Sequence, residues 1–190
     1  MVATTTINHA MGPKHDQDQI LAAAVAVASA EGLSRVSFGR VAKRLGISDR
    51  TVVYYFPTKD VLVGAVLLAM GLRLQETLAP ALTEPAADHR ALVRASWPVL
   101  AHPDADDVFA LFFEANGLAA AGHEPFATIV PQLVEAWLAW AAEHLHGAPG
   151  QRRAEATAAI ALIDGLLLLR QLAGPEVAQT AAVRMGVSPG

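Results

Sequence analysis

The sequence predicts an all-α fold, in which an N-terminal three-helix unit of the helix-turn-helix type precedes a larger helical body. The chain has 190 residues, of which 53% are hydrophobic and 17% charged, as is typical of a globular protein. Alanine and leucine are abundant and runs of β-branched residues are few, so helices are favoured over strands. Apolar residues recur at helical spacing between Gly, Pro, Ser and Thr residues that mark helix ends.

The chain divides into three parts. Residues 1–15 show no periodicity and are expected to form a flexible arm, residues 16–60 the helix-turn-helix unit, and residues 61–190 the helical body. The charge is divided as well: residues 1–60 hold seven basic and five acidic side chains, a net of +2, whereas the body holds seven basic and thirteen acidic ones, a net of −6. A basic head on an acidic body suits a protein that places one end on phosphate groups.

The stretch 37–59 is predicted to form two short helices joined by a tight turn, followed by the start of a long helix. Ser37 can cap the first helix, because its hydroxyl can accept a backbone N–H that is free at the first turn. Gly46 ends that helix, since glycine tolerates the left-handed conformation at a helix C-terminus. Ser48 caps the second short helix, residues 49–56, in the same way as Ser37.

The second short helix has two different sides. At about 100° per residue, Val52 and Phe56 lie on one face. A guanidinium, a hydroxyl and two aromatic rings on the opposite face suit a helix that lies in the major groove of DNA, where they can contact base edges and phosphates. These residues are Arg50, Thr51, Tyr54 and Tyr55.

The stretch SFGRVAKRLGISDRTVVYYFPTKDVL resembles the DNA-binding motif of the TetR family of transcriptional regulators. The matching residues are Ser37, Val41, Ala42, Gly46, Ile47, Ser48, Thr51, Tyr54, Tyr55, Phe56, Lys59 and Leu62. Two positions differ, because Val53 stands where the family usually has tyrosine and Gly39 where a polar or basic residue is common. Within this motif the expected DNA contacts come from Ser37, Arg40, Ser48, Arg50, Thr51, Tyr54, Tyr55 and Lys59.

A long helix is predicted from Thr58 to Leu82, crossing from the head to the body. Thr58 caps it, and Lys59 in its first turn can contact a phosphate together with the free N–H groups there. Because this helix belongs to both the head and the body, it can transmit a conformational change from the body to the head. The other expected helices are 16–31, 88–102, 104–121, 124–146, 151–173 and 175–185, with Pro98 and Pro131 inside two of them.

Seven of the eleven aromatic residues lie in the body, where they form either a core or the wall of a ligand cavity. For each single residue the core is the simpler interpretation, whereas the family resemblance implies a cavity for the group. The candidate ligand-binding residues are Met70, Trp97, His102, Phe109, Phe112, Phe113, Asn116, Trp137 and Trp140. They favour a small, largely apolar effector.

The segment 151–173 is apolar on nearly every side, and such a helix must be covered all round. One protomer of this size can hardly cover it, so we expect a homodimer in which 151–173 and 175–185 pack with their two-fold mates as a four-helix bundle. The TetR resemblance implies the same mode of dimerisation. The expected interface residues are Ile160, Ile163, Leu167, Val177 and Ala181.

Signals for other classes of protein are missing from the sequence. There is no cysteine, none of the seven histidines has a metal-ligand spacing, and no catalytic or phosphate-loop motif occurs, so no enzyme, metal or cofactor is expected. No signal peptide or membrane span is expected, which favours a cytoplasmic protein.

The resulting interpretation is a ligand-responsive transcriptional regulator, a repressor released from a palindromic double-stranded DNA operator by its effector. The alternative is a helical protein that binds or sequesters small molecules and whose helix-turn-helix is purely structural. A gel-shift experiment with DNA from the protein's own promoter region distinguishes the two.

Overall fold

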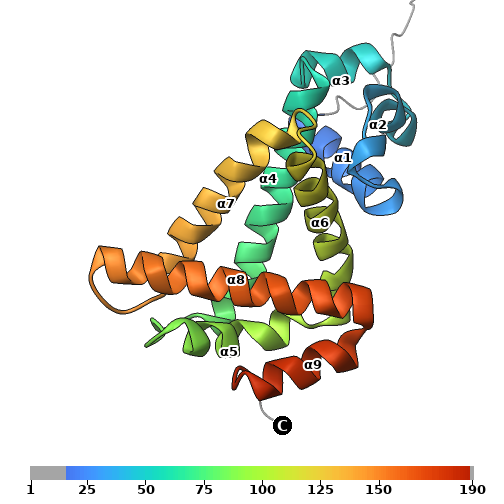
Figure 1. Cartoon of the computed structure of the whole chain (residues 1–190). Helices are drawn as coiled ribbons and strands as arrows, with labels where there is room; N and C mark the ends of the chain where they lie inside the picture. The colour runs from blue at the N-terminus through green and yellow to red at the C-terminus, as the bar shows by residue number, and fades with distance from the viewer. Residues whose placement is uncertain (1–15, 189–190) are drawn as a thin grey trace, which may run out of the picture.

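The computed structural model describes residues 16–188, and within this range the fold is all-helical, which confirms the predicted fold class. The predicted arm, residues 1–15, lies outside the described residues. Figure 1 shows a small head of short helices above a larger body, with the long helix α4 (Lys59–Leu78) connecting the two.

The head consists of α1 (Gln17–Glu31), α2 (Phe38–Leu45) and α3 (Asp49–Tyr55), with the 3₁₀ turn η1 (Leu33–Arg35) after α1. α2 packs against both α1 and α3, and α4 packs against α1. The head is therefore a compact helical unit that continues directly into the long α4.

The predicted caps determine where the helices of the head begin. The side-chain oxygens of Ser37, Ser48 and Thr58 each accept a hydrogen bond from the backbone N–H three residues later. Gly46 ends α2 with φ 69° and ψ 32°, a left-handed conformation that glycine adopts at little cost. Local chemistry thus sets the ends of α2 and the starts of α3 and α4.

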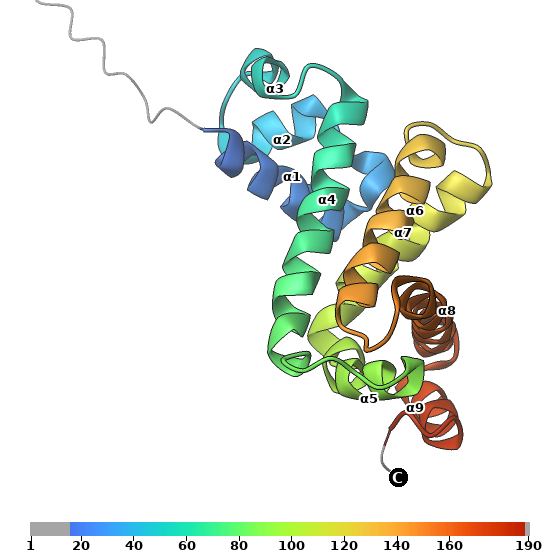
Figure 2. The same ribbon diagram turned by 90° about the vertical axis from the view of Figure 1, so that its left-hand side faces the viewer.

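The body contains α5 (His89–Leu100), α6 (Asp106–Ala120), α7 (Phe126–Glu143), α8 (Pro149–Ala173) and α9 (Pro175–Arg184). α4, α6 and α7 run from the head toward α8, which crosses beneath them in Figure 1. Figure 2, turned by 90°, shows α8 nearly end-on with α5 and α9 close by. Because α8 packs against α5, α6, α7 and α9, it is the central helix of the body.

Two predicted boundaries shift where the chain contains proline. α4 gives way to the 3₁₀ turn η2 (Ala79–Ala81), because Pro80 has no N–H to extend the α-helical hydrogen bonds. α6 begins only at Asp106, since Pro103 starts another 3₁₀ turn, η3 (Pro103–Ala105), before it.

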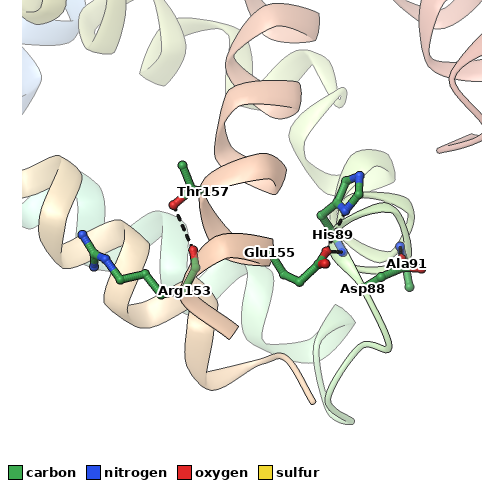
Figure 3. A network of polar contacts seen from close by, with 6 residues as sticks. All are labelled: Asp88, His89, Ala91, Arg153, Glu155 and Thr157. Atoms are coloured by element: carbon green, nitrogen blue, oxygen red, sulfur yellow. Dashed lines mark hydrogen bonds and ion pairs between the residues drawn. The ribbon is translucent and has the colours of Figure 1, made fainter. Parts of the chain in front are cut away.

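Polar contacts join the start of α5 to α8. Asp88 caps α5, and the next residue, His89, places both its backbone nitrogen and its ring Nδ1 against Glu155 Oε2, at 2.8 and 2.6 Å (Figure 3). The backbone hydrogen bond from His89, followed by the side-chain one, lowers the pKa of the Glu155 carboxyl. The contact therefore favours a charged carboxylate at the α5–α8 junction.

The buried residues form two cores. The first joins the helices of the head to α4 and includes Leu111 and Ala115 of α6 with Phe126 and Val130 of α7. The second lies in the body and includes residues of α5 to α9 together with Leu78 at the end of α4. The core of the head therefore continues beyond residue 60, and α4 takes part in both cores.

Two segments, Lys59–Ala81 and Pro149–Ala173, are long and apolar enough to cross a membrane by length and composition alone. Their most apolar windows are 33% and 22% buried. Core helices of water-soluble proteins pass the same test, and both segments contribute to the cores: Leu62 and Val66 are 0% exposed and Leu166 is 1% exposed. The low burial of the second segment leaves an apolar surface on the outside of the body.

Candidate nucleic-acid interface and ligand cavity

α3 lies at the end of the head that is farthest from the body (Figures 1 and 2). Its inner face carries Val52, and Phe56 follows at its end; they are 0% and 1% exposed, as predicted. Its outer face carries Arg50 and Tyr54, and Tyr54 is 78% exposed. Thr51 is half-buried. An exposed guanidinium and phenol on the outermost helix are free to contact another molecule.

Tyr55 lies closer to the core than predicted. It is half-buried and packs against the core of the head. Its ring meets the ring of Tyr54 edge-on, with the centroids 5.0 Å apart. Edge-to-face contacts of this kind are favourable, so Tyr55 supports Tyr54 in its outward position.

Three predicted DNA-binding residues use their hydroxyl groups within the head. Ser37 and Ser48 cap α2 and α3, and Ser48 Oγ also lies 3.0 Å from Thr51 Oγ1. Their direct effect is to orient the two helices. Any contact with DNA would use the remaining hydrogen-bonding capacity of these hydroxyls.

Two predicted cations contact other parts of the head. The Arg40 guanidinium pairs with Glu31 at the end of α1, and Lys59 Nζ lies 3.4 Å from the backbone oxygen of Ser34. Both side chains are exposed, and exposed ion pairs contribute little to stability. Arg40 and Lys59 can therefore exchange these contacts for a phosphate at small cost.

Sequence reasoning passed over two cations of the head. Lys43 and Arg44, in the last turn of α2, are exposed and form no ion pair within residues 16–188. At Gly39 a Cβ would lie 3.4 Å from Asp49 Oδ2, an ordinary van der Waals distance, so the packing of α2 and α3 does not require glycine there. The net positive charge of the head could have indicated the two cations.

A largely apolar cavity of about 120 Å³ lies in the body between α4, α5, α6, α7 and α8. An engineered apolar cavity of about 150 Å³ in another protein binds benzene, so this volume suits a group of roughly that size. Polar side chains in the lining are few, and Ser96 Oγ already donates a hydrogen bond to the backbone oxygen of Leu92.

Six of the nine predicted ligand-binding residues line this cavity: Met70, Phe109, Phe112, Asn116, Trp137 and Trp140. Trp137 and Trp140 share one face of α7, and their rings meet edge-on with centroids 5.2 Å apart. Phe109 and Phe112 make a similar contact on α6, at 6.5 Å. Aromatic side chains from two helices therefore face the same cavity.

Trp97, His102 and Phe113 are outside the lining. Trp97 is buried, and its Nε1 donates to Gln179 Oε1 of α9 at 3.0 Å. His102 is exposed, and its Nδ1 accepts a backbone N–H of η3. Phe113 follows Phe112 by one residue, so it is rotated by about 100° around the helix axis and packs in the core of the body.

Asp164 also lines the cavity, although it was not among the predicted ligand-binding residues. It is half-buried, and burial raises the pKa of its carboxyl to about 6. Among residues 16–188 no other ionisable side chain lines this cavity. The position of this carboxylate inside the otherwise apolar run 158–169 was a signal that could have identified it.

The predicted interface residues of α8 face inward. Ile160 and Ile163 line the cavity, and Leu167 is 1% exposed within the core of the body. In α9, Val177 is 46% exposed and Ala181 is half-buried. The prediction selected the inner side of α8, because a helix that is apolar all round has no periodic pattern from which to choose a side.

The outer face of α8 is exposed and consists mostly of small and apolar residues. They follow the three- and four-residue spacing of one helix face: Ala154, Thr157, Ala161, Gly165, Leu168 and Leu172. Leu168 and Leu172 are 42% and 78% exposed. This outer face of α8 is a continuous stripe that no part of residues 16–188 covers.

A carboxylate of α6 accepts hydrogen bonds from the 3₁₀ turn η1 of the head. Glu114 Oε2 accepts the backbone N–H of Leu33 at 2.9 Å, and Glu114 Oε1 accepts that of Ser34 at 3.0 Å. The same helix carries Phe112 and Asn116 in the cavity wall. α6 therefore connects the cavity to the head, in addition to α4.

The sequence model of the family described as "Bacterial regulatory proteins, tetR family" matches residues 20–66, from α1 to the first turns of α4. Residues 20–66 therefore form the DNA-binding head of the TetR family of transcriptional regulators. Regulators of the TetR family bind DNA and are not enzymes, which confirms both expectations drawn from the sequence. The exposed side of α3 thus belongs to a DNA-binding helix-turn-helix.

Solved structures resemble this TetR-family chain over most of its length, although no curated protein matches it. A proposed transcriptional regulator from Streptomyces coelicolor A3(2) is 27% identical with a TM-score of 0.65, covering 88% of this chain and 95% of its own. One from Saccharomonospora viridis, in complex with choline, is 20% identical with a TM-score of 0.64 over 90% and 92% of the two chains. The multidrug binding protein EbrR, complexed with proflavin, is 25% identical with a TM-score of 0.62 over 88% and 97%.

Proposed function

We propose that this TetR-family chain is a cytoplasmic repressor that binds a palindromic DNA operator as a homodimer and is released by a small, largely apolar effector. The observation that carries the proposal is the cavity, because α4 forms part of its wall and begins next to α3. The complexes of EbrR with proflavin and of the Saccharomonospora viridis protein with choline add that proteins of this fold hold small molecules.

In this proposal α3 reads the operator and the residues around it hold the DNA backbone. Tyr54 and Arg50 are the most exposed candidates for base edges. Lys59 contacts a phosphate together with the free N–H groups at the start of α4. Lys43 and Arg44 add positive charge beside α3, where it favours binding to any sequence.

The homodimer forms through the outer face of α8 together with α9. Gly165 and Ala161 in the middle of the stripe allow a second helix to approach closely, and Leu168 and Leu172 supply apolar area. Two copies of α8 and α9 then make a four-helix bundle. Two-fold symmetry places two α3 helices on successive half-sites of a palindrome.

The effector acts through the two helices that touch both the cavity and the head. α4 supplies Met70 to the cavity wall, and α6 supplies Phe112 while its Glu114 holds η1. An effector that favours a second packing of these helices moves the heads, so that the two α3 helices no longer fit the half-site spacing. A difference of about 1–3 kcal/mol in its binding to the two states changes operator affinity roughly 5- to 150-fold.

Operator binding is tested first. Fragments of the source genome that the full-length chain retains are selected, and gel shifts compare each fragment with a scrambled version of equal length. We expect a site with two-fold symmetry to be bound more tightly than its scrambled version. Equal affinity would contradict specific regulation and favour the alternative of a small-molecule-binding protein with a structural helix-turn-helix.

Effector release is tested on the selected operator. Small apolar and aromatic compounds that raise the Tm of the free protein are expected to lower its affinity for the operator. If such compounds instead strengthen operator binding, the protein is a repressor that requires its ligand. If no compound in a broad hydrophobic panel changes Tm or operator affinity, the ligand-responsive part of the proposal is wrong.

A further inference from the structure

The chemistry of the cavity narrows the class of effector beyond a small apolar molecule. Most of the lining is aliphatic or aromatic, yet Asp164 contributes a carboxylate. In the part of the chain that the structure describes, Asp164 forms no hydrogen bond or ion pair. A carboxylate without a partner is unfavourable in apolar surroundings, and a ligand with a positive charge would relieve this.

We propose that the effector is a lipophilic cation, with Asp164 holding its positive group and the aromatic side chains of the cavity holding its apolar part. This inference rests on the proposed function, since it names the ligand class of the same cavity. The effector is an organic ammonium or a related cation on an aromatic or aliphatic body, and a part of that body about the size of a benzene ring fills the roughly 120 Å³ cavity.

The aromatic residues suit the same ligand. Trp137 and Trp140 line the cavity from α7, which packs directly against α8, the helix that carries Asp164. The face of an indole ring attracts a cation through its quadrupole, and Trp is the most effective side chain for this contact. A carboxylate and two indoles in one cavity are a combination that recognises a quaternary or protonated amine.

Among residues 16–188, no cation pairs with Asp164. Burial is the cause of its raised pKa, and the arginines that link α8 to its neighbours have carboxylates of their own. The charged contacts between α8 and the packed helices are His89–Glu155, Arg153–Glu135 and Arg170–Asp106. In α9, Arg184 lines a separate hollow with His89, and Glu176 is exposed. The positive charge that would pair with Asp164 must therefore come from the ligand.

Two probes of the same shape test the inference. Phenyltrimethylammonium and tert-butylbenzene differ by a charged nitrogen in place of a quaternary carbon, so they share size and apolar surface. Affinity for the full-length protein is measured at pH 7.5 by calorimetry or by the fluorescence of Trp137 and Trp140. We expect the cation to bind about tenfold more tightly than the hydrocarbon or better.

The isosteric variant Asp164→Asn identifies the carboxylate as the source of the preference. We expect this change to weaken binding of the cation about tenfold and to leave binding of tert-butylbenzene unchanged or tighter. A second readout needs no variant: the affinity for the cation falls as the pH drops through about 6, where Asp164 takes up a proton, while that for the hydrocarbon stays constant.

Equal affinity for the two probes, no binding of the cation at millimolar concentration, or an Asp164→Asn variant that binds both probes like the wild type overturns the inference. Its outcome is separate from that of the proposed function. If the cation binds through Asp164 but leaves operator affinity unchanged, the ligand class stands and the release mechanism fails. If the hydrocarbon alone binds and releases the operator, the proposed function stands and this inference fails.

Discussion

Asp164 shows how a single residue can make stability depend on pH. Burial raises the pKa of its carboxyl from 3.8 to about 6, because apolar side chains replace water around the charge. Below about pH 4 the carboxyl is protonated in both the folded and the unfolded chain, so it has no net effect on stability. Between about pH 4 and pH 6 the unfolded chain releases this proton while the folded chain keeps it, so stability falls as the pH rises and levels off above about 6.

The variant Asp164→Asn removes this charge while keeping the shape of the side chain. At pH 8 we expect it to raise stability by about 1–2 kcal/mol, after allowing for partial exposure to solvent, or Tm by roughly 2–8 °C. The gain should shrink steadily between pH 7 and pH 4. Thermal unfolding across this range is the measurement, with Glu143→Gln, which neutralises an exposed carboxylate, as the control. A gain of the same size at every pH would point to packing instead of charge.

Tyr54 and Lys59 are expected to contribute to DNA binding in different ways. Tyr54→Ala should cost about 1–3 kcal/mol on the operator and much less on random DNA, because its exposed ring is placed to read bases. Lys59→Ala should weaken binding to all sequences alike. It should also reduce the slope of log K against log salt concentration by about one. Gel shifts at several salt concentrations separate the two effects. Equal losses on operator and random DNA for Tyr54→Ala would argue against base reading.

At the scale of elements, the junction of α6 with η1 is the most specific contact between body and head. The Glu114 carboxylate satisfies two backbone N–H groups at the start of η1. Gly32, just before this turn, has φ 92°, and a Cβ there would lie 3.1 Å from Glu114 Oε2. Gly32 therefore allows both the backbone conformation and the close approach of the carboxylate.

Removing the Glu114 carboxylate should loosen the head. We expect Glu114→Ala to lower stability by roughly 1–3 kcal/mol, because two N–H groups lose their acceptor. The effector should then change operator affinity less than in the wild type. Glu114→Gln keeps one acceptor oxygen and should recover part of both losses, whereas Glu143→Ala should change neither. Calorimetry and gel shifts with and without effector provide the two measurements, and an unchanged effector response would exclude α6 as a route of coupling.

How far the sequence predicts an element depends on whether local chemistry decides it. Ser48 and Gly46 set the boundaries around α3 through caps that any reader of the sequence can identify. The side of α8 that faces the core could not be predicted, because its residues are apolar in every direction and only tertiary packing turns Leu167 inward. Lining residues of the cavity were predicted where helical spacing places two aromatic residues on one face, as for Trp137 and Trp140. Asp164 was missed, because a single polar residue in an apolar run has no such pattern.

At the scale of the whole molecule, one protomer leaves the outer face of α8 uncovered. Leu172 is 78% exposed and Leu168 42% exposed on a helix whose other side includes the buried Ala159 and Leu166. A second copy that covers this stripe also brings its own α9, with Val177 exposed, into the interface. Oligomeric state and DNA binding are then linked, since a monomer would contact only one half-site.

The dimer is tested with a pair of matched substitutions. Leu172→Glu places a charge within the proposed interface, at the end of the stripe nearest α9, and should convert the dimer into a monomer, with loss of operator binding. Leu72→Glu changes a 50% exposed leucine of α4, outside the stripe, and should leave the mass unchanged. Light scattering at micromolar concentration gives the mass of each variant. A wild-type protein that is monomeric in this experiment would rule out the interface.

The shared core of head and body limits how this protein can be recombined with its relatives. Leu111, Ala115, Phe126 and Val130 belong to the body in sequence but pack among the helices of the head. A head transplanted from another regulator would meet these four side chains as foreign neighbours. Chimeras that redirect this body to a new operator should therefore carry the matching residues of α6 and α7 with the donor head.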